Sequence, residues 1–402
     1  MNIRHMEFSS NIANLQPSAT IAVSTLAKQL QSEGRDIIDL SAGEPDFDTP
    51  SWISAAAVAG IESGQTRYTP VAGIPELRKA VAGYLSTVSG DKVDWEGVVV
   101  SSGAKHALFN TAFACFGPGD EVLVTTPYWV SYPEIISLSR AESVFVSGNE
   151  QNNFLVTTED LDTAYTDRTK GLIVCSPCNP TGGVYSLEQL EALASWAKAR
   201  DLVLIADEIY REIYFGSDRS HAPSVLELPK EQRGNCVLID GVSKRFAMTG
   251  WRIGFSYSDP EIAKKLASIQ SHSTSNPASP SQMAALSAFG NLDKAEEEVR
   301  IMNKAFVRRK DLVASLLRER LPQLSFVEPE GAFYFFIKID SLFGDGHNGS
   351  VDVCSWILQE TGVAMVPGSA FGDDRFARIS FATSDDLLVE AIGRIASLLD
   401  KG

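Results

Sequence analysis

The chain has 402 residues, of which 44% are hydrophobic and 21% charged, so it can bury a large core, and we expect two domains. Its 35 basic and 51 acidic residues give a net charge of -16 without a long basic run, which disfavours binding to nucleic acid or to an anionic membrane. No stretch approaches the length of a membrane span, and residues 1–10 lack the apolar core of a secretory signal. We therefore expect a cytoplasmic protein with no membrane partner.

The five cysteines include one C-x-x-C pair, Cys175 and Cys178, which is a pattern found in redox sites and in half of a zinc site. No second pair and no nearby histidine completes a set of metal ligands. We therefore expect reduced structural thiols and no metal.

Short apolar runs alternate with helix-period stretches from about residue 95 to residue 260, which predicts an α/β fold with a mostly parallel sheet covered by helices on both faces. The expected strands are Val98–Ser101, Glu121–Thr125, Leu172–Cys175, Leu202–Ala206, Val237–Asp240 and Ile253–Tyr257. Helices are expected between them at Ala104–Cys115 and Leu187–Arg200. Ligands of such sheets bind beyond the carboxyl ends of the strands, so polar residues that follow a strand are the first candidates for a site.

A long charged helical pattern, Asp293–Arg320, leads into a second and smaller region. Strands are expected there near Phe333–Ile339 and Ala377–Phe381, and a last helix at Ser384–Leu399. We expect the N-terminal arm and helix to pack with this region. The predicted division is a large domain, residues 49–295, and a small α+β domain made from both termini, residues 1–48 and 296–402.

One segment, Gly241–Gly254, joins Lys244 to Arg252 eight positions later, with glycines near both. A lysine amine can form a Schiff base with a cofactor aldehyde, while a nearby arginine holds a phosphate dianion by paired hydrogen bonds. The spacing therefore indicates a site for pyridoxal 5′-phosphate. A solvated lysine and arginine in a loop is the alternative, because short motifs often match by chance.

Two further segments place polar residues after expected strands. Asp207 follows Leu202–Ala206 and Tyr210 lies three residues on, so a carboxylate could keep the cofactor's pyridine nitrogen protonated while the tyrosine binds its phenolate oxygen. A helix cap is the alternative for Asp207. In the turn Ser176–Gly182, Asn179 could reach the cofactor and a substrate carboxylate, and an X–Pro bond is a candidate for the cis form. A plain turn is the alternative.

Several long motifs stand in an order that carries a family resemblance: Pro17–Thr20, Ser41–Pro50, Arg67–Thr69, Ala72–Ile74, Pro127–Tyr132, Asp207–Tyr210, Gly241–Gly254 and Gly331–Tyr334. With these motifs the chain resembles, over nearly its whole length, the class I aminotransferases of the aspartate aminotransferase family. The resemblance implies fold type I of the pyridoxal-phosphate enzymes, with a mostly parallel sheet flanked by helices and a smaller α+β domain.

By this resemblance Lys244 is the Schiff-base lysine and the general acid-base, while Asp207 and Tyr210 hold the cofactor ring. Arg252 and the amides of Gly103 and Ala104 are expected to hold the phosphate, as the amino end of a helix suits it. A simple helix start is the alternative for the last two residues.

Two aromatic residues also have expected roles by resemblance. Trp129 stacks on the cofactor ring, and Tyr68 crosses to the phosphate of the partner subunit, which implies a homodimer with shared active sites. Ordinary core aromatics are the alternative. Gly241 departs from the enteric and animal enzymes, which carry a serine there, so one hydroxyl contact to the phosphate is missing.

For the substrate, Arg378 matches the family's arginine that binds the α-carboxylate through two hydrogen bonds, helped by Asn179 and the Gly43 amide. An exposed salt bridge is the alternative. Lys105, with Ser18 and Thr20, resembles the side-chain carboxylate pocket of the bacterial and plant subgroup.

The implied substrates are small amino and keto acids: aspartate and 2-oxoglutarate react to give oxaloacetate and glutamate. Thr20 with Lys105, and the segments Ala364–Gly368 and Phe371–Asp374, also resemble enzymes that transaminate prephenate to arogenate. The alternatives are an aminotransferase for aromatic amino acids or alanine, and a lyase on the same fold. A non-catalytic domain of a transcription regulator would need a DNA-binding module, for which we expect no room before residue 17.

Overall fold

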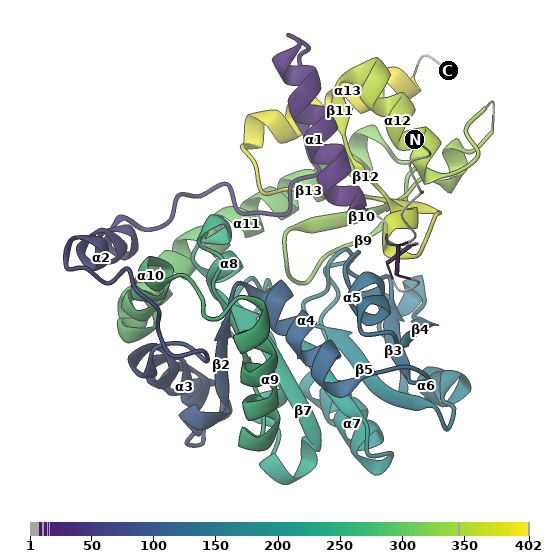
Figure 1. The fold of residues 1–402 in the computed structure, drawn as a ribbon. Coiled ribbons are helices and arrows are strands. Elements are labelled where there is room, and N and C mark those ends of the chain that lie inside the picture. The colour runs from purple at the N-terminus through teal and green to yellow at the C-terminus, as the bar shows by residue number, and fades with distance from the viewer. Residues whose placement is uncertain (1–7, 10–11, 14, 16, 345, 401–402) are drawn as a thin grey trace, which may run out of the picture.

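The computed structural model describes residues 8–9, 12–13, 15, 17–344 and 346–400, and its main feature is a seven-stranded sheet in the lower half of Figure 1. In spatial order the strands are β2 (Val98–Ser101), β8 (Gly254–Tyr257), β7 (Asn235–Gly241), β6 (Val203–Asp207), β5 (Thr169–Cys175), β3 (Glu121–Thr126) and β4 (Glu142–Ser147). Strand β8 is antiparallel to both neighbours, and every pair from β7 to β4 is parallel. The predicted mostly parallel sheet is confirmed.

All six expected strands are present, with ends that move by three residues or fewer. Strand β4 was not predicted, and it lies at the edge of the sheet beside β3 alone. Its residues are mostly half-buried or exposed. An edge strand of this kind has no continuous apolar run, so the pattern that identifies central parallel strands does not apply to it.

The helices lie around this sheet and in the upper part of Figure 1. Their bounds are α1 Ala19–Ser32, α2 Ser51–Glu62, α3 Pro75–Ser89, α4 Ala104–Cys115, α5 Tyr132–Leu138, α6 Thr158–Ala164, α7 Leu187–Ala199, α8 Val242–Arg245, α9 Pro260–Ser273, α10 Ser279–Gly290, α11 Leu292–Arg320, α12 Ser350–Thr361 and α13 Asp385–Leu399. Helix α13 begins one residue after the predicted start because Ser384 is its N-cap and accepts a hydrogen bond from the Leu387 amide. No helix in the described part of the chain is long and apolar enough to cross a membrane.

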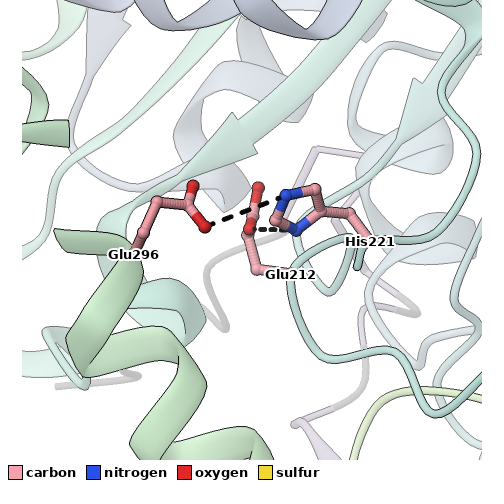
Figure 2. A group of neighbouring side chains, drawn as sticks. All are labelled: Glu212, His221 and Glu296. Atoms are coloured by element: carbon pink, nitrogen blue, oxygen red, sulfur yellow. Dashed lines mark ion pairs between the residues drawn. The ribbon is translucent and has the colours of Figure 1, made fainter. Parts of the chain in front are cut away.

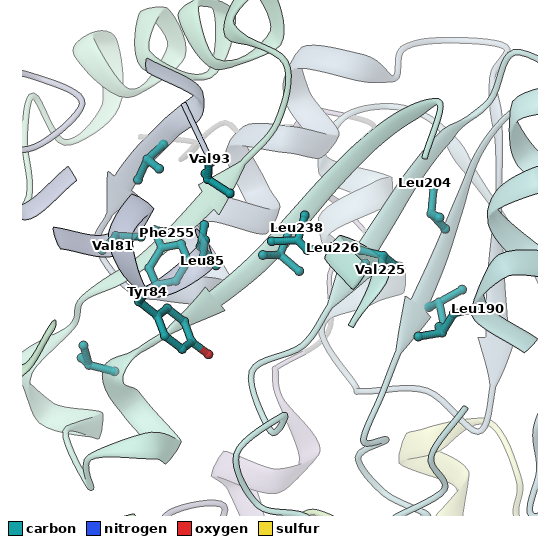
Figure 3. Close-up of a cluster of buried hydrophobic side chains, with 14 of the residues drawn as sticks. Val81, Tyr84, Leu85, Val93, Leu190, Leu204, Val225, Leu226, Leu238 and Phe255 are labelled. Carbon is teal, nitrogen blue, oxygen red and sulfur yellow. The ribbon is translucent and has the colours of Figure 1, made fainter. Parts of the chain in front are cut away.

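Alternate side chains of the central strands enter two separate cores, as the period of a strand requires. On one face, Val122 and Val124 of β3 pack with α4, α5 and α9. On the other face, Leu204 and Leu238 pack with Leu190 of α7 and with α3 and α10, and Figure 3 shows part of this cluster. The sheet therefore forms the middle of three layers and holds its strand ends rigidly.

The smaller region contains residues from both ends of the chain. Its four-stranded antiparallel sheet has the order β12 (Val366–Pro367), β13 (Phe376–Ser380), β10 (Tyr334–Lys338) and β9 (Phe326–Val327). The expected strands near Phe333 and Ala377 correspond to β10 and β13. A separate parallel pair joins β1 (Ile38–Asp39) to β11 (Val363–Ala364), so the N-terminal segment is bonded to the C-terminal region.

Gly254 of β8 permits a close approach of the sheet to the amino end of α4. A Cβ added to Gly254 would lie 2.2 Å from the Ala104 nitrogen and 2.5 Å from the Gly103 carbonyl carbon. These are backbone atoms, which cannot move aside as a flexible side chain can. The position of the first turn of α4 therefore depends on a glycine at residue 254.

We predict that Gly254→Ala destabilises the protein by about 1–3 kcal/mol, because the added methyl group overpacks the backbone of α4. Gly83→Ala is the matched control, since no described atom lies within 4 Å of a Cβ added at this exposed position of α3. In a helix that substitution is expected to stabilise by roughly 0.5–1 kcal/mol. Equilibrium urea unfolding measures both changes, and equal stability of the Gly254→Ala variant and the unmodified protein would contradict the prediction.

Candidate active site

A cavity of about 330 Å³ lies at the carboxyl ends of β5, β6 and β7, where residues of the smaller region meet the large sheet. It is lined by all the predicted site residues except Gly103 and Tyr68: Ser18, Thr20, Gly43, Ala104, Lys105, Trp129, Asn179, Asp207, Tyr210, Lys244, Arg252 and Arg378. Segments up to 360 positions apart in the sequence therefore meet at one place, which is the edge predicted for ligands in such a sheet.

Lys244 lies in the single-turn helix α8, directly after β7. Its Nζ donates a hydrogen bond to the Gly43 carbonyl at 2.5 Å and is 5.7 Å from the ring centroid of Tyr210. The pKa of Lys244 is lowered to about 8, chiefly by burial and also by the charges of Arg378 and Arg252, while Glu44 and Asp207 oppose the shift. A large fraction of this amine is therefore neutral, and nucleophilic, at mildly alkaline pH.

Asp207 is the last residue of β6 and is almost fully buried. The Tyr132 hydroxyl donates to its Oδ2 at 2.7 Å, and the Ile209 amide donates to its Oδ1 at 3.3 Å. Burial raises the pKa of Asp207 to about 6, although both hydrogen bonds and the charge of Lys244 oppose this shift. The helix-cap alternative is wrong, because a turn and not a helix follows β6.

Tyr210 lies in that turn, and its hydroxyl is 2.8 Å from the hydroxyl of Tyr334 on β10. Burial raises the pKa of Tyr210 well above its usual value, and the neighbouring Tyr334 adds to the shift. The phenol therefore stays protonated at neutral pH, so it can donate a hydrogen bond to an oxygen in the cavity.

Arg378 of β13 is 1% exposed, and among the described residues no carboxylate accepts a hydrogen bond from it. Its two terminal nitrogens donate to Asn179 Oδ1 at 2.9 Å and to the Ser41 carbonyl at 2.7 Å, and its Nε has no partner in the described structure. Burying a guanidinium without a counter-ion is costly unless an anion joins it. The exposed salt-bridge alternative is therefore wrong.

A second cationic region lies where α4 begins. Arg252 donates to the Thr249 carbonyl at 2.9 Å, and a Cβ added to Gly103 would lie 2.4 Å from one of its terminal nitrogens. The amide of Gly103 already donates to the Ser101 carbonyl at 2.7 Å, so the amide of Ala104 is the better placed of the two predicted phosphate donors. The positive end of the helix dipole and an arginine together favour a phosphate dianion.

These features fit pyridoxal 5′-phosphate. The cavity combines a buried lysine amine of lowered pKa, a buried carboxylate oriented by Tyr132, and a cationic helix start. The turn that carries Asn179 has cis bonds before Pro177 and Pro180, as expected for at least one of them, and Asn179 is buried beside Arg378. Trp129 lines the same cavity.

Gly241, where related enteric and animal enzymes have a serine, has a structural reason to be glycine. A Cβ added there would lie 2.8 Å from the Cα of Gly254, its partner in the antiparallel β7–β8 pair. The Ile253 carbonyl oxygen would be 3.0 Å away. A side chain at residue 241 would therefore push β7 and β8 apart.

The residues expected to set specificity, Lys105, Ser18 and Thr20, all line the cavity. The Lys105 ammonium is 4.8 Å from the ring centroid of Trp129, and burial, with the charge of Arg252, lowers its pKa. The hydroxyl of Thr20 is buried without a partner in the described structure. Tyr68 lies outside the cavity and is 90% exposed on the single chain, so the core-aromatic alternative is wrong for it.

Several residues of the cavity were not assigned a role from the sequence. They are Tyr132, Tyr334, Glu44 and Thr249. Tyr132 is hydrogen-bonded to Asp207, and Tyr334 to Tyr210. Glu44 accepts a hydrogen bond from the Thr249 hydroxyl at 2.6 Å. All four belong to motifs that carry the family resemblance, which was the only available signal, since their contacts join positions up to 205 residues apart.

We predict that the amine of Lys244 reacts faster as pH rises toward 8 and at a constant rate above it. The neutral fraction of an amine falls about tenfold for each pH unit below its pKa. Labelling of the cofactor-free protein with fluorodinitrobenzene, followed by peptide mapping of Lys244, measures this profile. Exposed Lys264, whose pKa is raised, serves as the internal control. A midpoint for Lys244 near that of Lys264 would contradict the prediction.

Comparisons with known proteins agree with this geometry. The family described as aminotransferase class I and II matches residues 35–395. The aspartate aminotransferase of Geobacillus stearothermophilus is 40% identical, over 98% of this chain and 99% of the relative. The aspartate/prephenate aminotransferase of Cereibacter sphaeroides is 41% identical, over 96% and 97%. The structure titled aspartate aminotransferase from Thermus thermophilus with maleate matches with a TM-score of 0.92 at 38% identity, over 98% of this chain and 100% of that one. The family implies pyridoxal phosphate as cofactor, and the chain belongs to the class I and II aminotransferases, with fold type I.

Proposed function

We propose that this aminotransferase moves the amino group of aspartate to 2-oxoglutarate, giving oxaloacetate and glutamate, and that prephenate is a further acceptor, giving arogenate. The observation that carries the proposal is the presence of two cations in one cavity, Arg378, which is buried, and Lys105, which is exposed. A dicarboxylic amino acid presents one carboxylate to each. The names of the relatives from Geobacillus and Cereibacter support both substrates.

Arg378 binds the α-carboxylate in this proposal. Its Nε has no partner among the described residues, and its terminal nitrogens contact an amide oxygen and a backbone carbonyl. A carboxylate offers the guanidinium two parallel, charge-assisted hydrogen bonds, which are stronger than the neutral ones it now makes. Asn179 already touches Arg378, so its amide group can join the same carboxylate, and the Gly43 amide completes the site.

Lys105 binds the second carboxylate, with Ser18 and Thr20 beside it on the wall of the cavity. The hydroxyl of Thr20, which is buried and has no partner in the described structure, suits an acceptor oxygen of the substrate. The ring of Trp129 lies against the Lys105 ammonium and limits where it can move.

When bound, pyridoxal phosphate supplies an aldehyde carbon that takes up the amino group and a ring that accepts electrons from the substrate α carbon. Arg252 and the amino end of α4, with the amides of Gly103 and Ala104, hold its phosphate, and Trp129 covers its ring. Asp207, ionised above about pH 6 and oriented by Tyr132, keeps a proton on the ring nitrogen. Tyr210 donates its phenolic hydrogen to the ring oxygen.

Lys244 anchors the cofactor and then acts as the acid-base group. With its amine free, Lys244 would take the proton from the substrate α carbon and would deliver a proton to the cofactor carbon that receives the amino group. The lowered pKa near 8 suits this work, since general acid-base catalysis is most efficient when the pKa lies near the working pH.

We also propose the domain division made from the sequence, residues 49–295 against 1–48 with 296–402. The parallel β1–β11 pair supports the joining of the two termini. A homodimer with shared active sites is proposed as well, in which Tyr68 reaches the phosphate held by the partner subunit. The 90% exposure of Tyr68 on the single chain supports this role.

We predict that aspartate alone removes the visible absorbance of the cofactor in the holoenzyme and releases one equivalent of oxaloacetate for each site. Added separately, 2-oxoglutarate and prephenate should each restore the absorbance. Lys244→Ala is expected to abolish repeated turnover while circular dichroism stays unchanged, because its amine moves the α proton. Ammonia release would indicate a lyase, and a response to alanine or phenylalanine alone would indicate another substrate class.

Substitution of the distal cation tests the substrate assignment. We predict that Lys105→Met lowers kcat/KM for aspartate by about 10- to 100-fold, the value of one charge-assisted hydrogen bond, with a much smaller change for alanine. Lys79→Met is the matched control, since Lys79 also lies over a tryptophan ring, that of Trp95, but outside the cavity. An equal loss for aspartate and alanine would show that Lys105 does not bind the side-chain carboxylate.

A further inference from the structure

A buried cluster of charged side chains lies next to Lys244 but outside the cavity. Its centre is Arg245, the residue after Lys244 and 2% exposed. We call it the Arg245 cluster, and its members are Tyr84, Arg211, Glu212, His221, Asp240, Arg245 and Glu296. None of these seven residues lines the cavity, and the proposed chemistry uses none of them.

Two arginines meet one carboxylate oxygen at the centre of the cluster. Arg245 donates to Glu212 Oε1 at 3.0 Å, and Arg211 donates to the same oxygen at 2.8 Å. The second terminal nitrogen of Arg245 donates to Glu296 Oε1 at 3.0 Å, and Tyr84 donates its hydroxyl to Glu212 at 2.8 Å. Burial alone would raise the pKa of Glu212, but Arg245 and its other neighbours hold it well below the usual value, so Glu212 is ionised.

A metal ion is the alternative explanation for part of this cluster. Figure 2 shows the imidazole of His221 paired with the carboxylates of both Glu212 and Glu296, and the ligand atoms of the three side chains lie within 4.8 Å of one another. However, the two imidazole nitrogens face different carboxylates, Nδ1 lying 2.8 Å from Glu212 and Nε2 3.9 Å from Glu296. Two arginines already neutralise the same carboxylates. A divalent cation would bring repulsion without a gain, so the group is an ion-pair cluster.

The cluster joins the segments that carry the proposed catalytic residues. Arg211 and Glu212 directly follow Tyr210 in the turn after β6. Asp240 lies one residue before the end of β7, and its carboxylate accepts a hydrogen bond from the Gly241 amide at 2.6 Å. Glu296 is on α11, whose Asn303 also donates to the Glu212 carbonyl at 2.6 Å. The turn, β7, α8 and α11 are therefore tied at one buried point.

We propose that the Arg245 cluster positions the amine of Lys244 relative to Asp207 and Tyr210, so that Arg245 and Glu212 are positioning residues for the reaction. This inference rests on the acid-base role proposed above for Lys244. Helix α8 has a single turn and few bonds of its own, so tertiary contacts must hold it. Within α8, Arg245 is the residue whose side chain is hydrogen-bonded both to Glu212, in the turn after β6, and to Glu296 of α11.

The effect on Lys244 is one of position and not of direct charge. The charges with the largest effect on the pKa of the Lys244 amine are those of Glu44, Arg378, Arg252 and Asp207. The charge of Arg245 is balanced by the carboxylates of Glu212 and Glu296. A change in the titration of Lys244 after Arg245→Lys, which keeps the charge of the cluster, therefore reports a displaced amine.

The test compares Glu212→Gln and Arg245→Lys in the full-length holoenzyme and in the same protein after removal of the cofactor. Arg245→Lys keeps the charge, but a single ammonium cannot bridge two carboxylates as the guanidinium fork does. Glu296→Gln is a milder third variant, because Glu296 is half-exposed and its loss leaves the buried pair intact. Glu121→Gln is the matched control, since Glu121 is a buried partner of Arg168 at the amino end of β3, far from the cavity edge.

We expect kcat to fall by roughly 10- to 100-fold in Glu212→Gln and less in Arg245→Lys, with KM for aspartate changed by less than about threefold, because a small misplacement of a reacting group acts mainly on turnover. The midpoint of Lys244 labelling in the cofactor-free protein should move by more than about half a pH unit. In Glu121→Gln the melting temperature falls, while kcat and the midpoint stay unchanged.

Two results would overturn the inference. One is a lower melting temperature in the Glu212→Gln and Arg245→Lys variants with the labelling midpoint and kcat of the unmodified protein, which is the behaviour of a purely structural cluster. The other is a fall of kcat in Glu121→Gln as large as in Glu212→Gln, which would show that loss of any buried ion pair lowers turnover. Repeated turnover by Lys244→Ala would instead disprove the proposed function itself, so the two failures are separable. If Glu212→Gln does not fold, Arg245→Lys still decides the outcome by the same two readouts, and Glu296→Gln is expected to change both in the same direction by a smaller amount.

Discussion

The burial of one amine governs the rest of the site. Lys244 lies at the end of β7 with its Nζ against the Gly43 carbonyl, and loss of solvent lowers its pKa to about 8. Burying a charged group costs free energy, so the charged form of the amine depends on the partners that surround it. Glu44 and Asp207 favour its charged form and two arginines oppose it, which leaves the amine close to balance between its two protonation states.

Two arginines of the cavity, Arg378 and Arg252, can determine the orientation of a bound molecule. Arg378 lies in β13 of the smaller region. Arg252 lies between α8 and β8 of the large region. A molecule that carries two anionic groups can be oriented by the two arginines, and the Lys244 amine lines the same cavity. Arg378 is in a strand of the smaller sheet and Arg252 lies just before β8 of the larger one, so the distance between them depends on how the smaller region packs on the larger one, through contacts such as Tyr210 with Tyr334.

The elements with a strong periodic pattern could be predicted closely from the sequence. Helix α4 has the expected bounds, and the buried central strands were found because they are continuous apolar runs between turns. The edge strand β4 and the two-residue strands β1 and β11 were not found, since their pairing depends on partners far along the chain. Local pattern carries no information about such partners.

The residues of the site also differ in how well the sequence predicts them. Lys244, Asp207 and Asn179 follow strands, so the topology of a parallel sheet indicates them from the sequence alone. Tyr132 beneath Asp207 and the bond from Arg211 to Glu212 depend on side-chain orientation in the folded core, which no spacing reveals.

Two glycines also show how the sheet limits the chemistry. Gly241 and Gly254 face each other across the β7–β8 pair, and Gly254 in turn faces the start of α4. Close packing here brings the amino end of α4, Arg252 and Lys244 to one cavity, but it leaves no room for a hydroxyl at residue 241. In the proposed site the cofactor phosphate would then rely more on the helix dipole and on Arg252, whose contributions are electrostatic and so weaken as salt concentration rises. The close packing of β7 on β8 thus excludes a hydroxyl group at residue 241, and the same packing places Arg252 at the cavity.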